Sequence, residues 1–198
     1  MARGRPRKTD PKQALEAAMQ LFWEKGYEAT SMNDLVAATG MAKPGLYATF
    51  GDKEALYGKA LSHYFHELGA PLVEDLLQSP EPIDQVVRRF LETVADSVRG
   101  KQCPSGCFIA NSVVESSGGP TALQDMARDF DAKRRAVFVR RFKKAKAEGE
   151  LPAEADEKAL AEFYAGQALA LAVMGRAGAS RTTLQRFIDT AMTVLPSG

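Results

Sequence analysis

Four polar side chains between positions 43 and 53 have the chemistry that contact with DNA requires. The Lys43 ammonium can donate to a guanine edge or to a phosphate oxygen. The hydroxyls of Tyr47 and Thr49 suit phosphate oxygens, and Lys53 can hold the sugar–phosphate backbone. Taken singly, Tyr47 is better explained as a half-buried core aromatic, and each lysine as a solvated surface charge. Their interpretation as one DNA-binding set depends on the elements that position them.

Residues 31–50 have the pattern of two short helices joined by a glycine turn, the helix-turn-helix. Ser31 can cap the first helix, and Asp34 three residues later resembles a capping box. Gly40 ends that helix and allows the tight turn. The second helix, at about 42–48, is then the recognition helix that enters the major groove. This geometry alone is only moderately specific for DNA binding, because many other pairs of helices resemble it.

The predicted recognition helix opens on small residues, which leaves its backbone N–H groups free to approach phosphate or base edges. Pro44 and Gly45 offer apolar and backbone contact, for example to a thymine methyl group. On the inner side, we expect Leu35, Val36 and Leu46 to hold the two helices against the preceding one.

The first twelve residues are basic, although the whole chain has a formal net charge of only +1. A basic arm can neutralise phosphates or enter a minor groove, and Arg5 and Arg7 are its candidate contacts. The alternative is a solvated, disordered terminus. Asp10 is the only acidic residue in this segment, whereas its basic residues are Arg3, Arg5, Arg7, Lys8 and Lys12.

Helical periodicity dominates the 198-residue chain, and no convincing alternating strand is present. The pattern predicts an all-α fold of about nine helices. One long helix should kink near Pro71, and residues 79–82 (Ser-Pro-Glu-Pro) read as a linker. No signal peptide is expected, and the most apolar stretch, 160–178, contains charges that favour a buried helix over a membrane span. Two cysteines make no disulfide scaffold, so a cytoplasmic location is expected.

The string from Ala29 to Leu56 resembles the TetR/AcrR family of one-component regulators, and the resemblance extends from about Asp10 to Leu61. Its specific motifs are Phe22-x-x-x-Gly26-Tyr27 and Leu46-Tyr47-x-x-Phe50-x-x-Lys53-Glu54-x-Leu56. Two positions depart from the family pattern. Met41 stands where valine is common, and Thr49 stands where many members have histidine or tyrosine, which weakens that phosphate contact.

The resemblance implies an all-helical homodimer whose three N-terminal helices bind a double-stranded, palindromic DNA operator, while the remaining helices bind a ligand and dimerise. On this basis the chain divides into a disordered basic arm (1–9), a DNA-binding domain (10–55) and a ligand-binding and dimerisation domain (56–198). The implied function is a repressor released by a small molecule. The family's DNA contacts correspond to Ser31, Met32, Asn33, Lys43, Pro44, Gly45, Tyr47, Ala48, Thr49 and Lys53.

Aromatic residues at helical spacing could line an apolar ligand pocket in the second domain, although such residues are more often plain core. The candidate pocket residues are Phe65, Phe90, Cys107, Phe108, Asn111, Phe130, Phe138, Phe163, Tyr164 and Gln167. The last two helices are the candidate dimer interface, with an intrachain core as the alternative. The candidate interface residues are Leu171, Met174, Leu184, Phe187, Ile188 and Met192.

Cys107, predicted at a helix N-terminus, and nearby Cys103 form a possible thiol switch that senses oxidants. The alternative is a buried Cys107 and an incidental Cys103. The segment from Gly106 to Glu115 resembles a Gly-Cys…Asn…Glu pattern of one family branch and indicates no particular ligand. His63 and His66 lack a third ligand, so neither a metal nor a cofactor is expected. The sequence contains no phosphate loop and no catalytic set of residues, so no enzyme is expected. The alternative function is a helical protein-binding module.

Overall fold

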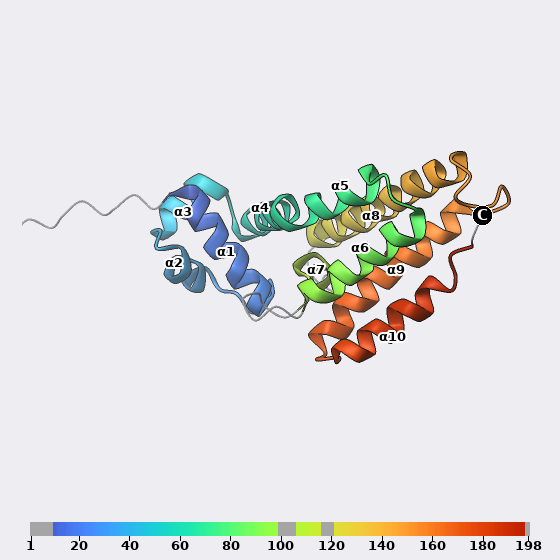
Figure 1. Cartoon of the computed structure of the whole chain (residues 1–198). Helices are drawn as coiled ribbons and strands as arrows, with labels where there is room; N and C mark the ends of the chain where they lie inside the picture. Colours follow the sequence, from blue (N-terminus) through green and yellow to red (C-terminus); the bar gives the residue numbers. More distant parts are fainter. Residues whose placement is uncertain (1–9, 99–105, 116–120, 197–198) are drawn as a thin grey trace, which may run out of the picture.

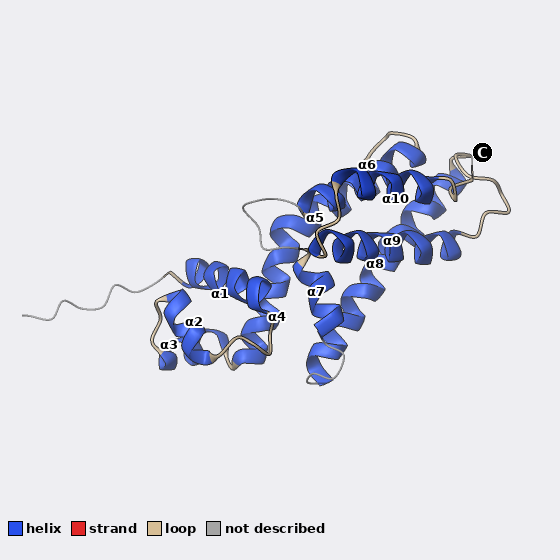
Figure 2. Ribbon diagram, turned by 90° about the horizontal axis from the view of Figure 1, so that it is seen from below, coloured by secondary structure: helices blue, strands red, loops and turns tan. Residues whose placement is uncertain are grey.

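The computed structural model describes residues 10–98, 106–115 and 121–196, and within these ranges it is built of helices without strands (Figures 1 and 2). Because α4, η1 and α5 follow one another without a break, the described chain forms nine helical rods, which confirms the all-α prediction. The elements are α1 (Pro11–Lys25), α2 (Met32–Thr39), α3 (Lys43–Phe50), α4 (Lys53–Tyr64), the π-helix η1 (Phe65–Gly69), α5 (Ala70–Gln78), α6 (Ile83–Ser97), α7 (Phe108–Glu115), α8 (Thr121–Ala147), α9 (Glu157–Arg176) and α10 (Arg181–Met192).

The expected kink at Pro71 takes the form of the π-helical segment η1. Proline has no N–H to donate, and its ring crowds the carbonyl four residues earlier. Widening the preceding turn relieves this conflict. The Ala70 N–H accordingly donates to the Phe65 carbonyl, five residues back. The result is one continuous rod that runs from the N-terminal helices into the rest of the molecule (Figure 1).

The described residues form two large hydrophobic cores at opposite ends of this rod, with a small third cluster of Val98, Ala110 and Ala172. The head, residues 10–64, closes around Phe22, Leu35 and Leu46 from α1, α2 and α3. The same core includes Phe108 of α7 and Leu123 of α8. The core of the head therefore extends well beyond residue 55, the predicted end of the DNA-binding domain.

The body, residues 70–98 and 121–196, is a bundle of α5, α6, α8, α9 and α10 around a separate core. The rings of Phe90, Phe138 and Tyr164 pack on one another there, with the centroids of Phe90 and Phe138 5.0 Å apart. The Tyr164 hydroxyl donates to the Ala191 carbonyl at 3.1 Å, which ties α9 to α10.

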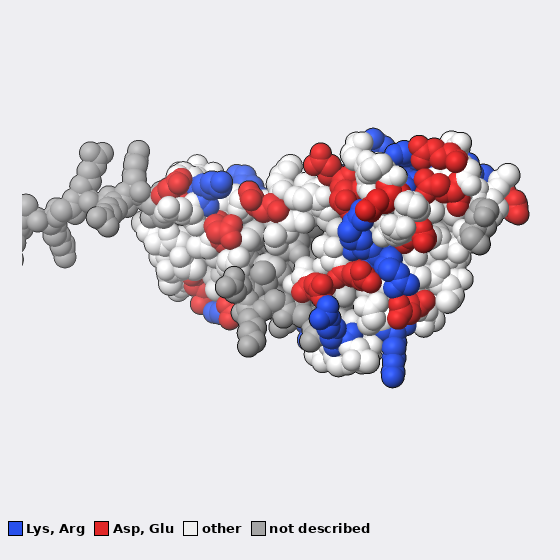
Figure 3. Space-filling view, in the orientation of Figure 1, with Lys and Arg blue, Asp and Glu red and all other residues white. Residues whose placement is uncertain are grey.

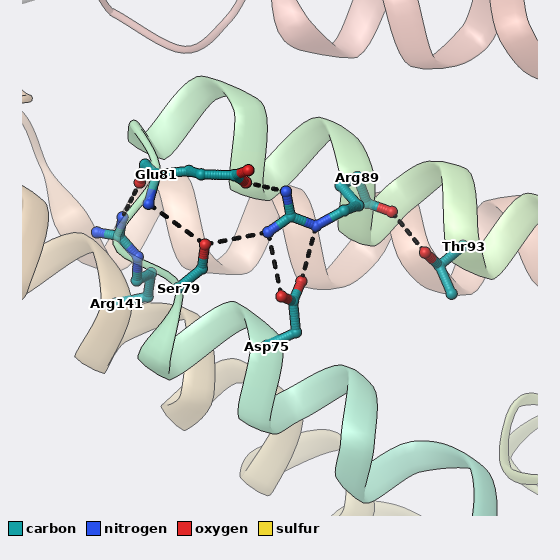
Figure 4. Close-up of polar contacts among 6 residues, drawn as sticks. All are labelled: Asp75, Ser79, Glu81, Arg89, Thr93 and Arg141. Atoms are coloured by element: carbon teal, nitrogen blue, oxygen red, sulfur yellow. Dashed lines mark hydrogen bonds and ion pairs between the residues drawn. The ribbon is translucent and has the colours of Figure 1, made fainter.

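The predicted linker at 79–82 is a fixed turn between α5 and α6 at the far end of the body. Arg89 donates to both carboxylate oxygens of Asp75, at 3.0 and 3.1 Å, and to the Ser79 hydroxyl at 3.1 Å (Figure 4). Arg89 also pairs with Glu81, whose carbonyl accepts from Arg141 at 3.2 Å. These bonds hold the predicted linker in one conformation.

Candidate nucleic-acid interface

The first helix of the helix-turn-helix, α2, begins at the predicted capping box. The Ser31 hydroxyl accepts from the Asp34 N–H at 3.1 Å, and an Asp34 carboxylate oxygen accepts from the Ser31 N–H at 2.9 Å. Lys25, in the last turn of α1, pairs with Asp34 at 3.1 Å. Hydrogen bonds from Ser31, followed by Lys25, lower the pKa of Asp34 to about 2. The start of α2 is thereby fixed to the end of α1.

Replacing Asp34 with asparagine should flatten the acid part of the stability profile. Because the pKa of Asp34 falls from 3.8 to about 2 on folding, its charge stabilises the fold fully above about pH 4 and loses that effect toward pH 2. Thermal midpoints of wild type and Asp34→Asn should therefore converge as the pH falls through this window. The exposed Asp129→Asn on α8 is the control. A gap between wild type and Asp34→Asn that does not change with pH would contradict the assignment.

The turn between α2 and α3 depends on Gly40, which adopts a left-handed conformation with φ of +66° and donates to the Val36 carbonyl. The Thr39 hydroxyl donates to the Leu35 carbonyl at 2.7 Å and accepts from the Met41 N–H at 3.3 Å. The turn thus has internal partners on both sides, and it sets the direction in which α3 leaves.

Helix α3 has one buried side and one exposed side. Leu46 and Phe50 are buried in the head core, at 1% and 5% exposure. Tyr47 is 45% exposed, which excludes its interpretation as a core aromatic. Ala42 gives the start of α3 no side-chain cap, and this end of the helix is open as the small residues predicted. The exposed side carries Lys43, Pro44, Tyr47, Ala48 and Thr49, with Gly45 half-buried beside them.

The other predicted DNA contacts lie around this surface. Ser31 and Asn33 are exposed at the start of α2, whereas Met32 is partly buried against the head core. Arg5 and Arg7 lie outside the described residues. On the face drawn in Figure 3, basic and acidic side chains are interspersed over the head.

Lys53, at the start of α4, lies over the ring of Tyr27 with its ammonium 4.2 Å from the ring centre, a cation–π contact. The Tyr27 ring itself stacks on Phe22 and meets the edge of Tyr57. Burial, followed by nearby carboxylates, raises the pKa of Tyr27. Lys59 donates to the Phe50 carbonyl at 2.9 Å and so caps the last turn of α3. Sequence reasoning missed the roles of Tyr27 and Lys59, although Tyr27 is part of the quoted Phe22-x-x-x-Gly26-Tyr27 motif.

The residues predicted for a ligand pocket divide between the two cores. Phe108 belongs to the head core, with Phe130 and Cys107 partly buried against it. Phe90, Phe138 and Tyr164 fill the body core, where each ring contacts another ring. The other members are Phe65, Asn111, Phe163 and Gln167, of which Asn111 is buried and the rest are half-buried.

Two cavities in the described part of the chain have different linings. One of about 160 Å³ lies between α6 and α10 and includes Glu92 and Arg181. The other, of about 280 Å³, lies between α8 and α9 and includes Arg134 and Glu162. Neither is lined by the predicted aromatic residues. The pocket of the sequence prediction stays a prediction, and a ligand would have to open the aromatic packing to reach it.

The predicted dimer residues on α9 and α10 are of two kinds. Leu171, Leu184 and Ile188 are at most 1% exposed and lie inside the body core, as the alternative of an intrachain core requires. Met174, Phe187 and Met192 are partly buried at the edge of that core. Val173 of α9 is 46% exposed beside them and was not among the predicted residues.

The candidate cysteine and histidine residues have different hydrogen-bond partners. The Tyr64 hydroxyl donates to the half-buried Cys107 sulfur at 3.4 Å, and Cys103 lies outside the described residues. His63 Nε2 lies 2.8 Å from a Glu16 carboxylate oxygen and links α4 to α1, while His66 is exposed. Within the described ranges, no group of three His, Cys, Asp or Glu side chains could hold a metal ion. Each helix in the same ranges is too short or too polar to cross a lipid bilayer.

Two family models match the chain along most of its length. Residues 14–65 match bacterial regulatory proteins of the tetR family. Residues 82–191 match the tetracyclin repressor-like C-terminal domain. The chain belongs to the TetR family. As a TetR-family protein it is a DNA-binding transcriptional regulator, and the helix-turn-helix of α2 and α3 lies within the part that the first model covers.

Relatives of this TetR-family chain match it over nearly its whole length. It is 31% identical over 195 residues to the HTH-type transcriptional repressor ComR of Escherichia coli, covering 98% of this chain and 93% of ComR. It is 30% identical over 196 residues to the uncharacterized HTH-type transcriptional regulator YezE of Bacillus subtilis, covering 97% and 99%. Among solved structures, a cysteine mutant of the regulator CifR complexed with 26-base-pair operator DNA is 30% identical, with a TM-score of 0.89 over 98% of this chain and 100% of that chain.

Proposed function

We propose that this protein is a sequence-specific transcriptional repressor that leaves its operator when a small molecule binds the body. The observation that carries the proposal is the exposed side of α3, where Lys43, Tyr47 and Thr49 project from a helix whose other side is fixed in the head core. The repressor ComR and the DNA complex of CifR support it. We assign the protein no catalytic reaction and propose a cytoplasmic location, where its DNA partner is found.

Each predicted contact residue on α3 and at the start of α4 has a role that fits its position. Lys43, Pro44 and Gly45, at the open start of α3, face the bases. Tyr47 and Thr49, further along, donate to phosphates, as does Lys53 from the start of α4. A two-fold dimer would place two such helices about 34–36 Å apart, or a multiple of that distance, and so read a palindromic operator. The dimer would use the exposed edges of α9 and α10.

Alanine at Lys43 should weaken binding to the operator about tenfold or more, because one base contact contributes roughly 1–3 kcal/mol. Phenylalanine at Tyr47 should weaken binding to every sequence by a smaller and similar factor, since it removes only a phosphate hydrogen bond. The operator is first selected from a random duplex library, and binding is measured by fluorescence anisotropy. Lys143→Ala, at an exposed position of α8, is the matched control. Equal binding of wild type and both head variants to all sequences would remove α3 as the reading element.

Removal of the N-terminal arm through Lys8 should lower the salt dependence of operator binding. For every phosphate that the arm neutralises, its removal should reduce the slope of log K against log salt concentration by about 0.9. The same anisotropy assay at four or more salt concentrations gives the slope. An unchanged slope would mean that Arg5 and Arg7 make no phosphate contact and that the arm is a solvated terminus.

A second form of control, thiol oxidation, is favoured by the surroundings of Cys107. Cys107 lies just before α7, and its sulfur accepts a hydrogen bond from the Tyr64 hydroxyl. The neighbouring Gly106 carbonyl accepts a hydrogen bond from the Trp23 indole of the head. We propose that peroxide joins Cys107 to Cys103 as a disulfide and that this displaces α7. Free thiols are counted before and after mild peroxide treatment, with operator binding followed in parallel and Cys107→Ser as the control. Undiminished binding by a fully oxidised sample would exclude the switch.

A further inference from the structure

Helix α7 is bonded at one end to α1 of the head and at the other end to the turn that follows α1. At its start, the Trp23 indole N–H donates to the Gly106 carbonyl at 3.0 Å in a buried position. At its end, the Tyr27 N–H donates to a carboxylate oxygen of Glu115 at 3.3 Å. Figure 2 places α7 between α4 and the long body helix α8, with which it also makes contact. The head therefore meets the body through a short helix that it holds at two points.

The approach of Glu115 to α1 requires the glycine at position 26. Gly26 has a φ of +82°, a conformation that ends α1 and that other residues rarely adopt. A methyl group at this position would lie 2.7 Å from a Glu115 carboxylate oxygen. The chain thus provides a place for one carboxylate directly against the backbone of the 26–27 turn.

The other oxygen of the same carboxylate faces the body. Arg176, the last residue of α9, lies with its guanidinium 3.7 Å from Glu115. The stem of Arg176 packs on Gly106, because a methyl group there would come within 3.2 Å of the Arg176 Cβ atom. Glu115 therefore joins the end of α1 to the end of α9, one of the two helices predicted to dimerise.

The Tyr27 ring extends this connection to the DNA-binding surface. Its backbone N–H is held by Glu115, and its ring lies under the Lys53 ammonium at 4.2 Å. A continuous series of contacts consequently runs from Arg176 through Glu115 and Tyr27 to a lysine that we assign to a DNA phosphate.

We propose that Glu115 is a positioning residue for DNA binding, which acts by holding Tyr27 under Lys53. A displacement of the α9 end would move the Glu115 carboxylate, shift the Tyr27 ring and withdraw Lys53 from the phosphate. The inference rests on the proposed contact between Lys53 and DNA. It adds to that contact a residue 62 positions away, on a helix that touches no DNA in the proposed mode.

A double-mutant cycle between Glu115 and Lys53 tests this coupling. Full-length wild type, Lys53→Gln, Glu115→Ala and the double variant are titrated with operator over a series of salt concentrations, with exposed Glu154→Ala as control. Lys53→Gln should weaken binding severalfold and lower the salt slope by about 0.9. Glu115→Ala should lower both the affinity and the salt slope, but by less than Lys53→Gln. The double variant should bind no more weakly than Lys53→Gln alone. Tyr27→Leu should resemble Glu115→Ala, whereas Tyr27→Phe, which keeps the ring, should resemble wild type.

The outcomes separate the two proposals. Reductions in affinity that multiply in the double variant, or a Glu115→Ala protein with normal affinity and slope, would overturn the positioning role. Normal binding by Lys53→Gln would overturn the Lys53–phosphate contact itself and, with it, the coupling. If Glu115→Ala does not fold, Glu115→Gln and Arg176→Gln replace it in the cycle, and they must show the same lack of additivity with Lys53→Gln.

Discussion

Replacing Phe108 with alanine should lower the free energy of unfolding by about 3–5 kcal/mol, as for other buried aromatic residues. The Phe108 side chain is 1% exposed. Its ring meets the edges of Tyr57 and Tyr64, with centroids 5.4 and 5.8 Å away, and lies 6.5 Å from the Trp23 ring. These partners come from α1 and α4 of the head, so the cavity left by alanine opens inside the head core.

Denaturant unfolding followed by two probes measures this effect. Circular dichroism reports all helices, whereas the fluorescence of Trp23, the one tryptophan in the chain, reports the head. Both transitions of Phe108→Ala should move to lower denaturant. Val114→Ala is the control, because this side chain of the same helix is 58% exposed and its removal should change stability by about 0.5 kcal/mol or less. A Trp23 transition that stays in place would show that α7 does not belong to the head core.

The behaviour expected of Phe108 shows which part of the fold the sequence could not supply. The sequence predicted a helix that begins at Cys107, and the structure has one at Phe108–Glu115. Periodicity says which face of a helix is apolar, but not which other helix covers that face. The boundary predicted at 55 followed the DNA-binding motif, whereas the packing of Phe108 and Leu123 continues the head core into distant segments.

The cap at Ser31 was predicted correctly, because the bonded N–H lies only three residues away. Asp10, Asp52 and Ser180 cap their helices through equally local bonds. The recognition helix was expected to end near Ala48, but it continues to Phe50. Local apolar packing of Phe50 and the Lys59 bond to its carbonyl extend the helix by two residues.

The same distinction applies to the functional site. The exposed side of α3 could be predicted, because it follows from which residues of one short helix are apolar. The contact of Lys53 with Tyr27 joins residues 26 positions apart, and the Glu115 contact joins residues 88 positions apart. Neither has a local signature. The aromatic residues assigned to a pocket are a different case, since composition alone cannot tell a filled core from a lined cavity.

The pair formed by Arg141 and Glu150 should respond very differently to removal of either partner. Arg141 is a fully buried arginine, with its side chain 1% exposed and 3.6 Å from Glu150. Its Nη2 atom donates to the Glu81 carbonyl, while Nε and Nη1 are buried without a hydrogen-bond partner among the described residues. Glu150 also accepts from the Ile83 N–H at the start of α6. Its carboxylate thus compensates the charge of the guanidinium and also caps a helix.

Alanine at Glu150 should therefore cost about 3–5 kcal/mol, because it leaves a buried positive charge uncompensated. Methionine at Arg141 should cost little or even stabilise the body, since it removes the desolvated charge and its unpaired N–H groups while it fills a similar volume. Because the damage in Glu150→Ala comes from the arginine, the double variant Arg141→Met/Glu150→Ala should be more stable than Glu150→Ala alone.

Urea unfolding of the three variants measures these differences, with exposed Glu154→Ala from the same turn as the control. If Arg141→Met proved as unstable as Glu150→Ala, the bond from Arg141 to the 79–82 turn would be the stabilising contact. The expected order of stability, with Arg141→Met above Glu150→Ala, follows from desolvation instead. Burying a charged guanidinium that has one carboxylate partner and two unpaired N–H donors is unfavourable. Removing its carboxylate partner leaves the whole desolvation penalty uncompensated.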